Sequence, residues 1–161
     1  MKQSEESELS SSKTRALRIL GNRNLSAREI EKRLVSKGET AETAQQTVQW
    51  LEDIGMINDK EYASLIVRHY ISKGYGLGRI REELYRRGID RELWEEALAD
   101  LDGMEDAAYA FISKKLDGEC GKDEVRRATN ALHARGFSYE EARAAANRYL
   151  AGFGETEEIV Q

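Results

Sequence analysis

One short pattern that occurs three times constrains the fold of this chain more than any other feature. Leucine, two variable residues, a basic residue and glycine occur as LVSKG ending at Gly38, LYRRG ending at Gly88 and LHARG ending at Gly136. Matching apolar positions precede each leucine at helical spacing, and an N-cap residue type follows each glycine. Self-similarity with a period of about 50 residues indicates a repeat protein built from small supersecondary units.

Each unit of the repeat is predicted to be helical. The chain contains no proline, and its apolar residues recur at three- and four-residue spacings. Capping boxes of the S-x-x-E type at Ser26 and Ser138 predict two helix starts. Gly38, Gly88 and Gly136 are expected to end helices in the left-handed conformation, which makes them structural residues. The sequence therefore predicts an all-α fold of three tandem three-helix repeats that resemble helix-turn-helix units.

Two matching turns, around Gly55 and Gly103, separate the repeats. The predicted organisation is a disordered polar tail at 1–12, three-helix repeats at 13–57, 58–104 and 105–152, and an acidic C-terminal tail at 153–161. One such unit is too small to bury a sufficient core by itself. We therefore expect neighbouring repeats to stack into an elongated, curved array.

Composition excludes several functional classes. Mean hydropathy is -0.69, and no apolar run approaches the ~18 residues of a membrane span, so we expect a cytoplasmic protein without membrane contact. The single cysteine, Cys120, and the two separate histidines, His69 and His133, cannot form a disulfide, a cysteine-based metal site or a nucleophile with its base. We expect no enzymatic activity, no cofactor and no metal, and we expect a monomer.

Charge varies in bands along the chain, although the net charge is -5. In the first two repeats the first and middle helices are basic and the third is acidic. Helical periodicity places Arg79 and Arg86 toward solvent, with Arg81 and Arg87 beside the buried stripe. The candidate partner-binding residues are Arg28, Lys32, Arg33, Lys37, Arg68, Lys73, Tyr75, Arg79, Arg81, Arg86, Arg87, Arg126 and Arg127.

Alternatives remain open for some of these positions. Lys37, Arg87 and the equivalent Arg135 could contact a partner or simply complement the negative end of a helix dipole. The glycine-rich run GYGLG, residues 74–78, lacks the G-K-[ST] ending of a phosphate loop, so it is interpreted as a tight corner between two helices. Tyr75 within it is either a core residue or a contact residue.

The segment KGYGLGRIREELYRRGID, from Lys73 to Asp90, resembles the signature of the RecX family, bacterial modulators of the RecA recombinase. The family pattern is close to K-G-Y-G-P-x-R-I-x-x-E-L-x-x-[KR]-G-I, and Leu77 replaces its proline. The resemblance extends from about Thr14 to Leu150 and is loosest in the third repeat, where Ala128 and Thr129 depart from it.

This resemblance implies a regulatory protein that lies in the groove of the RecA–DNA filament. It implies inhibition of RecA recombinase, ATPase and co-protease activities, and thereby modulation of DNA repair and the SOS response. The partner would be the RecA filament, with a possible weak contact to single- or double-stranded DNA. Capping of filament ends, disassembly and groove occlusion are equally compatible with it. Alternating charge bands suit a partner that presents both acidic protein and phosphate.

The alternative interpretation is a DNA-binding transcription regulator of the helix-turn-helix or winged-helix class. In the first repeat, the helix expected to read DNA would span Ala41 to Asp53. That segment contains no lysine or arginine, which makes it poorly suited to a groove lined by phosphates.

Overall fold

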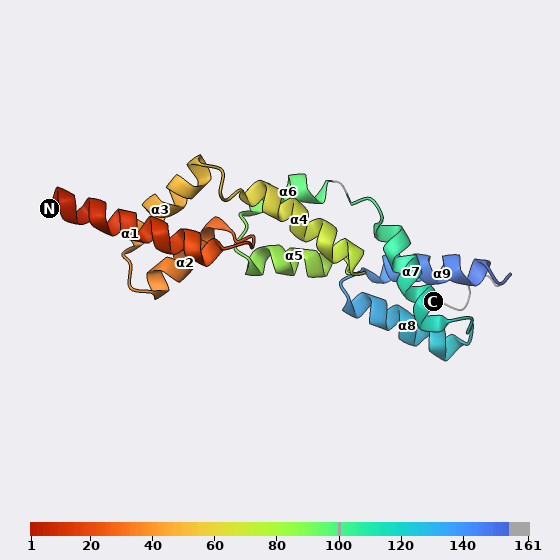
Figure 1. Cartoon of the computed structure of the whole chain (residues 1–161). Helices are drawn as coiled ribbons and strands as arrows, with labels where there is room; N and C mark the ends of the chain where they lie inside the picture. Colours follow the sequence, from red (N-terminus) through yellow and green to blue (C-terminus); the bar gives the residue numbers. More distant parts are fainter. Residues whose placement is uncertain (100, 155–161) are drawn as a thin grey trace. The chain divides into compact units, whose positions relative to one another are not determined.

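The computed structural model describes residues 1–99 and 101–154. That part of the chain holds nine helices and no strand (Figure 1). They are α1 (Lys2–Leu20), α2 (Ala27–Ser36), α3 (Ala41–Asp53), α4 (Asp59–Ser72), α5 (Leu77–Arg86), α6 (Arg91–Leu98), α7 (Met104–Leu116), α8 (Lys122–Ala134) and α9 (Tyr139–Ala151). The prediction of an all-α fold with tandem three-helix repeats is confirmed, and the curved array stays a prediction.

The repeated leucine and glycine belong to one helix-ending motif. Gly38, Gly88 and Gly136 have φ angles of 100°, 74° and 103°, so all three adopt the predicted left-handed conformation. The residue after each glycine donates its N–H to the carbonyl of the repeated leucine, at 3.2, 3.1 and 3.4 Å. This is the Schellman arrangement, in which only glycine fits the left-handed position without strain.

The helix starts follow the predicted capping signals. The Ser26 hydroxyl accepts a hydrogen bond from the Glu29 N–H, and the Ser26 N–H donates to the Glu29 carboxylate. Ser138 and Glu141 form the same reciprocal pair. Thr40 accepts the N–H of Thr43 at the start of α3. Both predicted capping boxes are therefore confirmed.

The predicted disordered tail at 1–12 is wrong, because α1 already begins at Lys2. Ser12 is fully buried, and its hydroxyl oxygen lies 2.6 Å from a carboxylate oxygen of Glu39 and 2.6 Å from the hydroxyl oxygen of Thr47. These hydrogen bonds anchor α1 at a residue within the predicted tail. The preceding turns are mainly exposed and lack apolar periodicity, so the sequence carried no signal for them. The predicted acidic tail at 153–161 lies outside the described residues from position 155 onward.

Two compact units make up the chain. The first consists of Met1–Ser64 with Leu84–Ala97, and the second of Leu65–Glu83 with the residues from Leu98 onward. The middle repeat contributes to both units, and no boundary between units coincides with a predicted repeat boundary.

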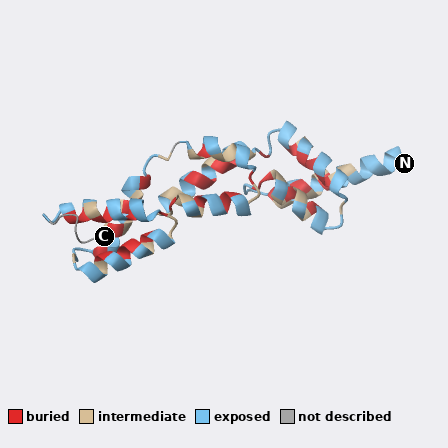
Figure 2. Ribbon diagram, turned by 180° about the vertical axis from the view of Figure 1, so that it is seen from behind, coloured by how far each residue is buried: buried red, intermediate tan, exposed pale blue. Residues whose placement is uncertain are grey.

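Each unit has its own buried apolar residues (Figure 2). The core of the first unit includes Ala16, Leu20, Ile30, Leu34, Ala44, Leu51 and Ile57. Buried residues of the second unit include Ile80, Ile112, Val125, Leu132, Phe137 and Leu150. Among the described residues, no helix combines the length and apolarity needed to cross a membrane.

Candidate partner-binding surface

The glycine-rich run before α5 packs directly against the loop that follows α8. Gly76 N donates to the Arg135 carbonyl at 2.9 Å, and Gly78 N donates to the Gly136 carbonyl at 3.0 Å. A Cβ on Gly76 would overlap the backbone of Gly136 and Phe137. The run is therefore a structural corner whose missing side chains allow two backbones to meet, and its amides at the start of α5 are satisfied by another repeat.

Arg135, for which the sequence left open a partner contact or a role at the helix dipole, connects the two sides of this junction. Its guanidinium donates to the carbonyls of Gly74 at 3.0 Å and Lys73 at 2.6 Å. The same group lies 4.1 Å from the centroid of the Tyr75 ring and 5.1 Å from that of Phe111. Carbonyl acceptors and aromatic faces suit the planar guanidinium, so Arg135 acts as a structural clamp inside the second unit.

Tyr75 is held between two arginines. The guanidinium carbons of Arg79 and Arg135 lie 5.6 and 4.1 Å from the centroid of its ring. The centroid of the Tyr70 ring is 5.5 Å from the same point. The Arg79 side chain, predicted to point to solvent, is 42% exposed, but its Nε is buried. The loop after α8 covers the start of α5, which helical periodicity alone could not show. Arg81, predicted to flank the core, is exposed instead.

A second junction in the first unit repeats this arrangement. The Ser26 hydroxyl at the start of α2 donates to the Arg87 carbonyl at 2.5 Å. A Cβ on Gly88 would lie 2.8 Å from the Arg28 Cβ. In the repeat register, Arg87 and Gly88 correspond to Arg135 and Gly136. In both junctions the loop after one middle helix therefore packs on the start of the middle helix of the preceding repeat.

Several side chains around the junction in the first unit form hydrogen bonds or ion pairs within it. Arg87 donates to the Tyr62 hydroxyl at 2.6 Å, and Arg28 pairs with Asp90 at 3.1 Å. The Asp59 carboxylate accepts the Ala27 N–H at 2.9 Å. Burial raises the pKa of Asp59, although the hydrogen bond from Ala27 acts in the opposite direction. Arg87 is thus a junction residue as much as a candidate contact.

The remaining predicted residues lie on several helices. Lys32, Lys37, Arg68, Lys73, Arg81 and Arg86 are exposed, and Arg33 is half-buried. Arg126 and Arg127 on α8 pair with Asp123 at 2.8 Å and Glu124 at 3.6 Å. The structure brings Tyr75 and Arg79 together in the second unit and brings Arg28 close to the loop of Arg87 and Gly88 in the first. Lys73 is joined to this site only through its carbonyl, which accepts a hydrogen bond from Arg135.

Three further basic residues join Lys73 around one groove of about 680 Å³ in the second unit. They are Lys114 and Lys115 on α7, and Arg135, and the ring of Phe111 also lines the groove. No acidic side chain is among the described residues that line it. We call these five residues the basic groove. Such a surface attracts an anionic partner and is the best candidate binding site of the molecule.

Several known proteins are similar to this chain in sequence. The family model for the second three-helix domain of RecX matches residues 58–98. A regulatory protein RecX from Xanthomonas citri is 34% identical over 134 residues, which cover 81% of this chain and 83% of the relative. The chain belongs to the RecX family. The RecX protein of Chromohalobacter salexigens is 32% identical and covers 80% of this chain, with 86% of its own length matched.

A solved RecX structure has the same fold. The crystal structure of RecX from Lactobacillus salivarius superposes with a TM-score of 0.82, covering 91% of this chain and 99% of that one at 22% identity. These RecX relatives are named regulatory proteins. The part of the chain that the structure describes contains no group of histidine, cysteine and acidic residues suited to a metal ion.

Proposed function

We propose that this RecX protein regulates RecA by binding the RecA–DNA filament, with the basic groove as a principal contact. The groove supports this proposal because it gathers Lys73, Lys114, Lys115 and Arg135 beside an aromatic ring, and none of the described residues that line it is acidic. A filament presents acidic protein surface and DNA phosphate, and both are attracted to such a site.

The resemblance supports the remaining part of the proposal. Lying in the filament groove, the protein inhibits RecA recombinase, ATPase and co-protease activities and so modulates DNA repair and the SOS response. Direct contact with DNA is a secondary, weaker interaction. The transcription-regulator alternative has less support, because α3 carries no lysine or arginine.

The first prediction tests the basic groove. Lys114→Glu with Lys115→Glu reverses two exposed charges, so the fold survives while inhibition of DNA-dependent ATP hydrolysis by RecA weakens at least tenfold. The matched control, Lys122→Glu with Arg143→Glu, makes the same charge change at exposed positions that do not line the groove. Titration of the wild-type chain against a fixed RecA concentration gives the reference curve.

Two outcomes of this titration contradict the proposal. Wild-type protein without effect on RecA would remove the proposed function itself. Equal inhibition by the groove variant and the wild type, with both folded by circular dichroism, would leave regulation intact and exclude the basic groove. The wild-type curve also separates the modes of inhibition, since end capping acts at substoichiometric amounts and groove occlusion needs many copies per filament.

A further inference from the structure

The loop around Gly38 is a third copy of a surface that the chain uses twice internally. Gly88 and Gly136 are each covered by the start of a middle helix, and a Cβ on either would lie within 2.8 Å of that helix. A Cβ on Gly38 would meet nothing within 4 Å. The Lys37 carbonyl corresponds to the carbonyls of Arg87 and Arg135, which accept hydrogen bonds, but no group in the described part of the chain donates to it.

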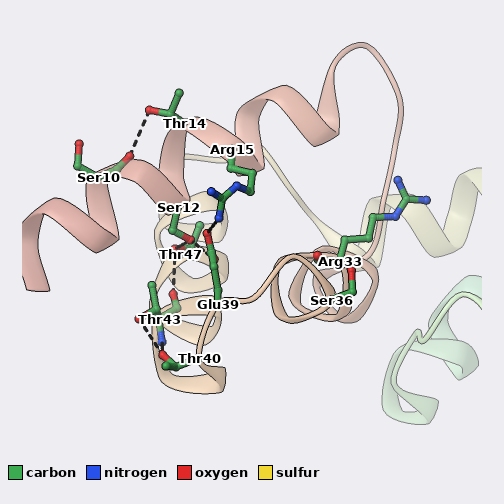
Figure 3. A network of polar contacts seen from close by, with 10 residues as sticks. All are labelled: Ser10, Ser12, Thr14, Arg15, Arg33, Ser36, Glu39, Thr40, Thr43 and Thr47. Carbon is green, nitrogen blue, oxygen red and sulfur yellow. Dashed lines mark hydrogen bonds and ion pairs between the residues drawn. The ribbon is translucent and has the colours of Figure 1, made fainter.

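The surroundings of Gly38 differ from those of the other two glycines. Ile89 and Phe137 follow Gly88 and Gly136 and are buried, whereas Glu39 follows Gly38. Arg15 donates to the Glu39 carboxylate at 2.5 Å, and Ser12 donates to it at 2.6 Å (Figure 3). The loop therefore holds a carboxylate that is 9% exposed and paired with Arg15, where its counterparts hold a buried apolar side chain.

A groove of about 320 Å³ lies beside this loop in the first unit. Ser7, Glu8, Ser11 and Arg15 of α1 line it together with Gly38, Glu39, Thr40 and Thr43. Carbonyl, carboxylate and hydroxyl oxygens thus surround the open glycine. These oxygens accept hydrogen bonds. The Glu39 carboxylate is paired with Arg15, which also lines the groove, so Glu8 supplies the unneutralised negative charge that favours a positively polarised ligand.

The first turn of a helix has this complementary chemistry. Its N–H groups lack acceptors within their own helix, and the helix dipole places about half a positive charge there. The two equivalent loops in this chain already bind helix starts through backbone carbonyls. We propose that the Gly38 loop binds the exposed first turn of a helix on a RecA protomer, an inference that rests on the proposed function.

A second copy of this chain does not offer an equivalent occupant. The starts of α2 and α5 are already occupied in their own junctions. α8 begins at Lys122, about one turn before Val125, the position that corresponds to Ala27 and Leu77 at the starts of α2 and α5. The extra turn lies where a docking loop would be placed. No middle helix of a second copy can therefore dock as α2 and α5 do, which favours a helix of a different protein as the occupant.

Ser11→Trp tests this site. Ser11 is exposed and lines the groove, so tryptophan fills the groove without disturbing the core. Ser10→Trp is the matched control, since Ser10 is exposed on the same helix but does not line the groove. We expect co-sedimentation with RecA–DNA filaments to weaken at least tenfold for Ser11→Trp and to stay at the wild-type level for Ser10→Trp, with equal thermal stability of both.

Hydrogen exchange of the wild-type chain provides a measurement without substitution. Filaments should slow exchange of the amides from Gly38 to Thr43, which lie at the groove. Wild-type binding with unchanged exchange there, or equal binding by Ser11→Trp, would overturn the inference and leave the proposed function standing. Absence of wild-type binding would overturn both. Self-association of the chain that Ser11→Trp abolishes would show a second copy as the occupant and also refute the inference.

Discussion

Gly76 and Gly78 face the same loop at different distances. The position of a Cβ on Gly76 is already occupied by backbone atoms, whereas a Cβ on Gly78 would lie 3.2 Å from the Gly136 carbonyl oxygen. Neither glycine has a positive φ angle, so the requirement at Gly76 comes from a neighbouring backbone and not from its own conformation. Two glycines in one motif thus have different reasons to be glycine.

This difference predicts opposite tolerance to alanine. Gly76→Ala should lower the free energy of unfolding by about 2 kcal/mol or more, because backbone atoms cannot yield easily. Gly78→Ala should change it by less than about 1 kcal/mol, because the tight contact opposes the gain of replacing glycine within a helix. Urea denaturation followed by circular dichroism measures both. Equal losses for the two variants would contradict the close contact at Gly76.

The helix starts at Ser26 and Ser138 share a capping box but not a neighbourhood. Ser26 is completely buried and its hydroxyl also donates to Arg87, whereas Ser138 is exposed and serves its own helix. A cap within one helix can be recognised from residues three apart. The bond from Ser26 to a residue far along the chain cannot, because it depends on which loop packs there.

We therefore expect unequal effects of the same substitution at these two starts. Ser138→Ala should cost about 1 kcal/mol, the usual value of a lost N-cap. Ser26→Ala should cost more, about 2 kcal/mol, because it also removes the buried hydrogen bond from the Ser26 hydroxyl to the Arg87 carbonyl. Local hydrogen exchange in α2 and α9 reports each effect separately. A smaller loss at Ser26 than at Ser138 would mean that the junction adds no stability.

At the scale of the whole molecule, the sequence predicts features that depend on nearby residues and misses features that depend on packing between distant segments. Helices, caps and left-handed glycines depend on neighbours a few residues away, and the repeat pattern predicted them. Lys114 and Lys115 were missed, and the clamp formed by Arg135 was not predicted, because their importance comes from packing between distant segments. The α1 start was missed because exposed polar helix turns look like a tail. The burial of the Arg79 Nε was missed because the loop of another repeat covers the start of α5.

Salt dependence is the matching prediction for the whole molecule. With a net charge of -5, the chain should owe most of its electrostatic attraction to filaments to the local basic groove, so raising salt from about 50 to 200 mM should weaken binding on the order of tenfold. The Lys114→Glu and Lys115→Glu variant should show a flatter dependence. Fluorescence anisotropy of labelled protein at increasing salt checks this, and salt-independent wild-type binding would argue against the groove.

The early start of α8 makes the two ends of the repeat series different. In both junctions, a loop of the later repeat packs on a helix start of the earlier one. The third repeat lacks the helix start that would receive a following loop, while the first still presents an uncovered Gly38. Lengthening this protein by one unit is therefore compatible with an addition ahead of the first repeat and incompatible with an addition behind the third. A chain of this kind can therefore gain repeats in one direction, and the residue at which α8 begins determines that direction.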